Sequence, residues 1–266
     1  MSLSDAIFDR YSIMARQRPA LLMLFPGLVG TVVMLPSLQS WWATLLAVTG
    51  TCGVSMALTE LAQGKGKALE PGLISLWDKL PSVAMLRHRD SRLDSHTKCR
   101  YKAFLAANVP GLIFPDASAE AASPAIADDA YQSATTWLLA RTRDRKIFGL
   151  LFEKNISYGF RRNMLGLLRL GVGVSLAALA ATVITAIHDT IIARQIDGTL
   201  IFGAFVALAA FSFWTMVVKP DWVEIAATAY ARELLAACDS LMDKIPVYRP
   251  SDVRRRKQNS SRAGSG

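Results

Sequence analysis

The sequence predicts an all-α integral membrane protein with four transmembrane helices, forming two hairpins with a helical cytosolic domain inserted between the second and third. The first observation is a set of apolar stretches without Asp, Glu or Lys: Pro19 to Leu38, Trp41 to Leu58, Leu167 to Ile187, and Thr199 to Val218. Each holds about 20 residues, which at about 1.5 Å of rise per residue spans the roughly 30 Å hydrocarbon core of a bilayer. The second is composition: with a mean hydropathy of +0.28, the chain is too apolar for an ordinary soluble domain.

The predicted spans and the polar segments between them divide the chain into six parts. These are an amphipathic helix (1–18), a first hairpin (19–60), a cytosolic helical domain (61–166), a second hairpin (167–218), a further cytosolic helix (219–249) and a basic disordered tail (250–266). The amphipathic helix is predicted from apolar residues spaced three and four apart. The tail lacks any apolar periodicity.

Charge predicts the orientation. Of the 30 Lys and Arg residues, 3 precede the first span, 16 lie between Leu61 and Gly166, and 9 follow from Lys219 onward. Because basic segments resist translocation, the N-terminus, the middle domain and the C-terminus should be cytoplasmic. We therefore expect a multi-pass protein of a bacterial-type inner membrane. Three cysteines without paired spacing suit a reducing compartment.

The middle domain reads as helical throughout. Residues 64–72, with two Gly–Lys pairs, Pro71 and Gly72, read as a linker that leaves the membrane. Asp94 or Ser95 should cap a helix to about Ala107. Ser123 and Pro124 should start another, with a buried face drawn from Ile126, Ala130, Ala134, Trp137 and Leu138. A further helix, 147–157, is expected to pause at Gly159.

The helix after Pro220 carries a seam of apolar residues at alternating spacings of four and three. Its members are Val223, Ala227, Tyr230, Leu234, Ala237 and Leu241. A repeat of 3.5 residues is the pattern of a coiled coil, but two alanines in three heptads make a weak one. The seam therefore predicts either packing onto the middle domain or self-association.

The densest polar run, residues 87–102, is the candidate ligand-binding segment. Its cations are Arg87, Arg89, Arg92, Lys98, Arg100 and Lys102. Guanidinium forks bind phosphate oxygens in pairs, so a phosphorylated small ligand is one prediction, and a cytosolic protein is another possible partner. Apposition to anionic lipid headgroups and ion pairing within the domain are the other two readings. Double-stranded nucleic acid is disfavoured, because no recognised binding module accompanies the charge.

The same run holds the only candidates for catalysis: His88, Asp90, Asp94 and His96. Imidazole titrates near neutrality and carboxylates can activate water, so a hydrolase could use them as acid and base. Their spacing specifies no known reaction. His88, His96 and Cys99 lack the paired spacing of a zinc site, and we expect no metal or cofactor.

Interfacial residues are expected to anchor the spans. The cations are Arg161, Arg162 and Arg169, and the aromatic residues are Trp41, Trp42, Trp214 and Trp222. Long cationic side chains reach headgroups, and indole rings prefer the membrane interface.

Function is less determined than topology. No ionisable side chain lies deep in a span, which disfavours a proton-coupled transporter. We expect a non-enzymatic, self-associating protein whose cytosolic domain senses a ligand or partner and whose spans transmit the signal or permeabilise the membrane. Membrane-disrupting effectors of bacterial defence systems share this general plan, although no motif here matches one of their families. The alternatives are a membrane-tethered hydrolase and a scaffold subunit of a membrane complex.

Overall fold

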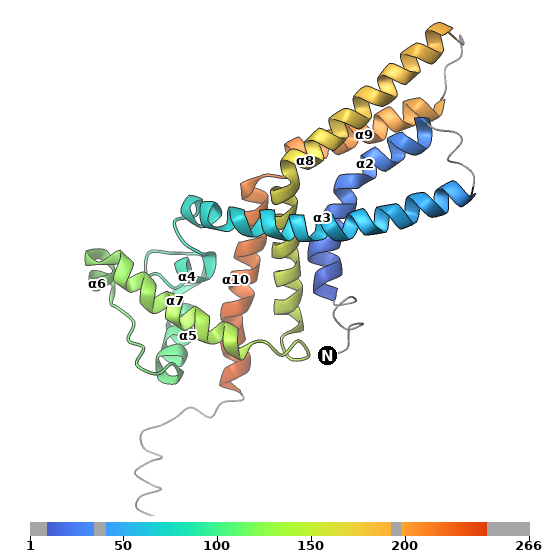
Figure 1. Cartoon of the computed structure of the whole chain (residues 1–266). Coiled ribbons are helices and arrows are strands. Elements are labelled where there is room, and N and C mark those ends of the chain that lie inside the picture. The colour runs from blue at the N-terminus through green and yellow to red at the C-terminus, as the bar shows by residue number, and fades with distance from the viewer. Residues whose placement is uncertain (1–9, 35–40, 193–197, 244–266) are drawn as a thin grey trace, which may run out of the picture. The chain divides into compact units, whose positions relative to one another are not determined.

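The computed structural model describes residues 10–34, 41–192 and 198–243, and gives side-chain surroundings for these except residues 41–56. Within these ranges the chain is helical and contains no strand (Figure 1). It divides into two compact units. The span unit comprises Met1–Trp77 with Lys154–Ala227, and the polar unit comprises Asp78–Glu153 with Thr228–Gly266.

Three helical segments of the span unit are long and apolar enough to cross a membrane. They are Ser12–Met34, which joins the π-helix η1 (Ser12–Gln17) to α2 (Arg18–Met34), then α8 (Gly149–Ile192) and α9 (Gly198–Met216). The predicted span Trp41 to Leu58 forms the first part of α3 (Trp41–Leu76). The side chains of residues 41–56, including Trp41 and Trp42, lie outside the described residues, so a fourth span stays a prediction. Residues 2–9 of the predicted amphipathic helix also lie outside them.

Glycine lets the helices of the span unit approach closely. Trp214 of α9 is 1% exposed, and a Cβ added at Gly171 of α8 would overlap its indole ring. Trp214 therefore lies in the core of the span unit, where the missing side chain of Gly171 leaves room for its indole ring. Its place at the membrane interface stays a prediction.

The predicted linker at 64–72 is wrong, because these residues continue α3 as helix. A Cβ at Gly66 would overlap Oδ1 of Asn163, and one at Gly166 would lie 2.7 Å from the Gly66 nitrogen. These glycines thus serve the crossing of α3 and α8, where a side chain would hold the helices apart. Gly159 similarly continues α8 without a pause, and a Cβ there would lie 3.3 Å from that of Ala15.

The polar unit is built on α4 (Pro81–Ala84), α5 (Ser95–Asn108), α6 (Ala117–Ala122), α7 (Pro124–Arg141) and the later part of α10 (Pro220–Met242). Each of the longer helices contributes side chains to its core. Among them are Leu105, Tyr131, Leu138 and Leu234, each 0% exposed. Asp94 caps α5 as predicted, by accepting from the Thr97 backbone N–H at 2.8 Å.

The buried face of α7 lies one residue away from the predicted one. Ile126 is 72% exposed, whereas Ala127 and Asp128 are buried; Ala134 and Leu138 are buried as expected. The apolar pattern misplaces the face because an acidic residue occupies one of its positions. That residue, Asp128, has a buried cation as its partner.

Candidate functional site

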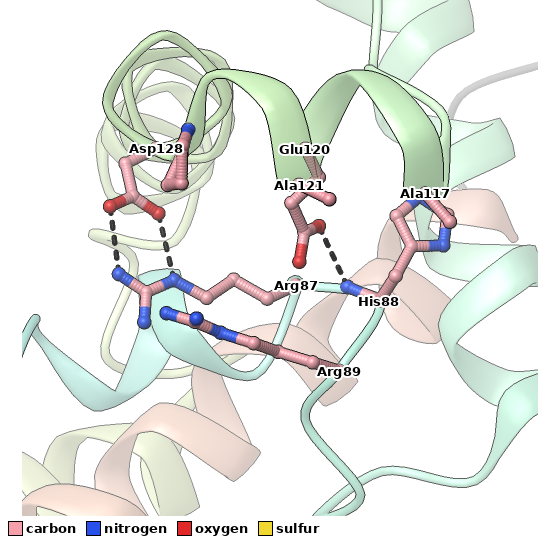
Figure 2. Close-up of a pocket in the computed structure, with 8 residues that line it drawn as sticks. Arg87, His88, Arg89, Ala117, Glu120, Ala121 and Asp128 are labelled. Carbon is pink, nitrogen blue, oxygen red and sulfur yellow. Dashed lines mark hydrogen bonds and ion pairs between the residues drawn. The ribbon is translucent and has the colours of Figure 1, made fainter.

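Arg87 forms the centre of the candidate site. It lies on the turn after α4, and its guanidinium meets Asp128 of α7 as two parallel forks (Figure 2). Nε donates to Oδ1 at 2.8 Å and Nη2 donates to Oδ2 at 2.7 Å. Nη1 donates to Asp78, a residue with a positive φ of 68° at the end of α3. The hydrogen bond from Arg87 lowers the pKa of Asp128.

Lys98 stabilises the same turn through hydrogen bonds to its backbone carbonyls. Its ammonium, in a side chain that is 8% exposed, donates to the Arg87 carbonyl at 2.8 Å and to the Asp90 carbonyl. Burial lowers the pKa of Lys98, while Asp90 and Glu120 favour its charge. Arg92 forms an ion pair with Asp90 at 2.6 Å. The turn that carries Arg87 is therefore stabilised both by Lys98 and by this ion pair.

A second polar cluster surrounds His88. Its backbone N–H donates to Oε2 of Glu120 at 2.8 Å, and the same oxygen accepts from the Tyr131 hydroxyl at 2.6 Å. Burial alone would raise the pKa of Glu120, yet these hydrogen bonds bring it below its ordinary value. The His88 Nε2 atom lies 3.0 Å from the Pro115 carbonyl and 3.1 Å from Lys102 Nζ, so it donates to one or accepts from the other according to tautomer.

Lys102 is half-buried beneath aromatic rings. Its ammonium lies 4.9 Å from the centroid of Tyr131 and 5.7 Å from that of Phe114, two rings that stack on each other. Burial lowers the pKa of Lys102 to about 8, with a smaller contribution from the charge of Lys98.

A cavity of about 530 Å³ opens beside these clusters (Figure 2). Its lining residues are Arg87, His88, Arg89, Ala117, Glu120, Ala121, Pro124 and Asp128. Helices α6 and α7 supply its small apolar residues together with the carboxylates of Glu120 and Asp128. The turn after α4 supplies Arg87, His88 and Arg89, and Arg87 is already paired with Asp128.

Arg89 is the group of this pocket best placed to meet a ligand. Its side chain is 62% exposed and makes a single described contact, to Asp78 at 3.2 Å. A guanidinium has five N–H donors, so four remain for a bound molecule. The pocket can therefore hold a small molecule with an apolar face and a hydrogen-bond acceptor or anionic group at one end.

The predicted ligand-binding cations separate into two groups. Arg87 and Arg89 line the pocket, whereas Arg92, Lys98, Arg100 and Lys102 do not. Arg100 pairs with Asp239 of α10 at 3.0 Å, and the other three contact the partners described above. These contacts favour ion pairing within the domain for most of the run.

The candidate catalytic residues are not gathered at one point of the pocket. Of them only His88 lines it. Asp90 holds Arg92, and Asp94 caps α5. His96 and Cys99 lie on α5, and no group of three His, Cys, Asp or Glu side chains within the described ranges is placed to hold a metal ion.

Sequence reasoning did not find the acidic partners Asp78, Glu120 and Asp239. Glu120 lies far along the chain from His88, whose backbone it meets, and Asp239 lies far from Arg100, so spacing gives no local signal for either. Asp78 lies nearer to Arg87 along the chain. Asp128 did carry a local sequence signal, because it shares a helical face with Tyr131 and Leu138. A carboxylate on a buried face requires a buried cation.

Other predicted residues take structural positions. Arg162 pairs with Glu70 of α3 at 3.1 Å, while Arg169 is exposed. Of the predicted seam on α10, Val223 and Ala227 are buried in the span unit. Leu234, Ala237 and Leu241 lie in the core of the polar unit, and Tyr230 packs against it.

Comparison with protein-family models, curated proteins and solved structures finds no match for this chain. The pocket and the apolar helices are therefore the features of this chain that bear on its function.

Proposed function

We propose that this chain is a non-enzymatic, self-associating protein of the inner membrane, with both termini in the cytosol. Its polar unit receives a small ligand or a protein partner, and its spans permeabilise the membrane or transmit the signal. The observation that carries the proposal is a pocket with an exposed guanidinium, in a unit separate from that of the apolar helices. Ligand recognition and membrane insertion are thereby assigned to different parts of one chain.

The pocket suits binding better than hydrolysis. A hydrolase would need a carboxylate or imidazole free to activate water, yet Asp90 and Asp94 serve Arg92 and the α5 N-terminus. The His88 ring adjoins Lys102 and a carbonyl oxygen. A membrane-tethered hydrolase thus has less support, as has a scaffold that docks through the α10 seam, whose side chains are largely buried.

Membrane potential in expressing bacterial cells, followed with a potential-sensitive dye, tests the permeabilising arm. We expect expression of the chain to depolarise the cells, and Arg89→Gln to remove most of this effect. Arg89 makes only an exposed ion pair, worth at most about 1 kcal/mol, so its loss should spare the fold.

The matched control is Arg143→Gln, which removes an exposed cation of the polar unit outside the pocket. It should depolarise cells as the unaltered chain does. Equal loss in both variants would assign the effect to net charge, and no depolarisation by the unaltered chain would overturn permeabilisation.

A further inference from the structure

Two neighbouring arginines of α8 have different surroundings in the span unit. Arg162 is 9% exposed and neutralised by Glu70, whose other oxygen accepts from the Tyr158 hydroxyl at 3.2 Å. Arg161 is half-buried, and no ion pair of the described residues includes it. The charge of Arg162 is therefore compensated by Glu70, whereas Arg161 has no counter-ion within the part of the chain that the structure describes.

The guanidinium of Arg161 is nevertheless fixed in place. Its Nη1 donates to the Trp222 carbonyl at 2.8 Å, and its carbon lies 4.9 Å from the centroid of the Trp222 ring. Phe160 and Phe213 hold that ring by edge contacts, at 6.2 and 6.4 Å between centroids. This hydrogen bond uses one of the five N–H donors of the guanidinium, and four remain for a bound molecule. An oriented, partly desolvated cation of this kind is suited to a phosphate.

The position of Arg161 along α8 places it close to the predicted headgroup layer, where lipid phosphates occur. It precedes the third predicted span, which starts at Leu167, by six residues, or about 9 Å along a helix. Trp222 follows the end of the fourth by four residues. The headgroup layer borders the hydrocarbon core on each side, and an arginine side chain can reach it from this distance. Lys219 adds an exposed cation in the same turn, since its carbonyl accepts from the Trp222 N–H at 3.1 Å.

We propose that Arg161, oriented by Trp222, binds the phosphate of an anionic phospholipid in the cytosolic leaflet. This rests on the membrane location in the proposed function, and it assigns the two arginines different roles. Arg161 binds lipid, whereas Arg162 joins α8 to α3. The lipid phosphate supplies the counter-ion that the described residues do not provide.

Lipid retention by the full chain tests the assignment. The protein, purified in a neutral detergent, is exposed to equal amounts of phosphatidylglycerol and phosphatidylcholine, and bound lipids are counted by native mass spectrometry. We expect the unaltered chain to prefer phosphatidylglycerol and Arg161→Gln to weaken that preference roughly fivefold, as one interfacial cation should. Arg161→Lys, which keeps charge but not the fork, should lie between them.

Arg162→Gln is the matched control, because it removes the same charge one residue away. It should lower the thermal unfolding temperature but keep the lipid preference. Unchanged preference in Arg161→Gln, or equal loss in both Gln variants, would overturn the assignment. If Arg161→Gln fails to fold, Arg161→Lys against Arg162→Lys gives the same comparison. Lipid counts in detergent are independent of the potential measurement, so the two proposals can fail separately.

Discussion

Single residues of the polar unit show how a strongly basic segment can be folded inward. Arg87 and Lys98 are 6% and 8% exposed and thus buried, although both carry charge. Carboxylates and backbone carbonyls surround them, because a buried cation without such partners would cost several kcal/mol. A dense basic run is therefore a poor guide to its own exposure, and it is the partner residues that decide.

The Arg87–Asp128 pair gives the first prediction at this scale. Asp128→Asn should destabilise the polar unit by about 2–3 kcal/mol, because the change leaves Arg87 without its forked partner. The probe is Cys238, which is 0% exposed in the core of the unit. With Cys52 and Cys99 replaced by serine, Cys238 is the single thiol. A thiol reagent should modify it faster in the Asp128→Asn variant than in the protein that keeps Asp128.

Asp129→Asn is the control, since Asp129 is an exposed neighbour on the same helix. It should leave the reactivity of Cys238 unchanged. Equal rates in both variants would show that the fork does not stabilise the unit.

Lys102 gives a prediction in pH. Its pKa is about 8 when folded and about 10.5 when unfolded, so at pH 9 the unfolded chain holds a proton that the folded chain has lost. Stability should therefore rise between about pH 8 and 10 relative to a variant without this amine. Thermal unfolding of the unaltered chain and of Lys102→Met, followed by circular dichroism, measures the difference. Parallel pH profiles would contradict the shifted pKa.

At the scale of elements, the glycines of α8 occupy two kinds of position, one packed against a neighbouring helix and one open. Gly171 of α8 faces the Trp214 ring, whereas a Cβ at Gly173 would meet nothing within 4 Å. Glycine inside a helix otherwise costs up to about 1 kcal/mol relative to alanine. Gly171 is therefore required by packing, and Gly173 is not.

Gly171→Ala should accordingly destabilise the span unit by about 1–3 kcal/mol through overpacking, and Gly173→Ala should be neutral or stabilising. Thermal unfolding in detergent, followed by tryptophan fluorescence, compares the two. The pair controls for helix propensity, because both changes add the same methyl group to α8. Similar effects of both would show that Trp214 does not pack on Gly171.

At the scale of the whole molecule, the proposed function requires several copies. The apolar stretches of the three candidate transmembrane helices carry no charged side chain deep within them, which leaves little room for an aqueous path within one chain. Ser175 and Thr182 of α8, which could line such a path, are 0% exposed and donate to carbonyls of their own helix. A path would then form between subunits.

We therefore expect a discrete oligomer of four or more subunits. Multi-angle light scattering of the protein in nanodiscs, with the lipid mass subtracted, measures the number directly. A stable monomer would be incompatible with a shared pore.

Several helices and their ends follow from local chemistry. Side-chain capping and proline geometry act within a few residues, so they can be predicted from the sequence. Examples are the cap at Asp94 and the helix starts at Pro124 and Pro220. The glycines at 66 and 159 were misread as breaks, since only a neighbouring helix distinguishes a flexible glycine from a packed one. The buried face of α7 differs from the predicted one because it includes Asp128, a charged residue that the apolar pattern leaves out.

The sequence by itself determined that the chain is helical and carries helices apolar enough to cross a membrane, because hydropathy and helix signals are summed over consecutive residues. Only the tertiary structure decided which cations remain available. Arg87 and Arg162 meet carboxylates far along the chain, while Arg89 and Arg161 keep donors for other molecules. Charge in a sequence is additive, but its compensation depends on pairs that only folding brings together.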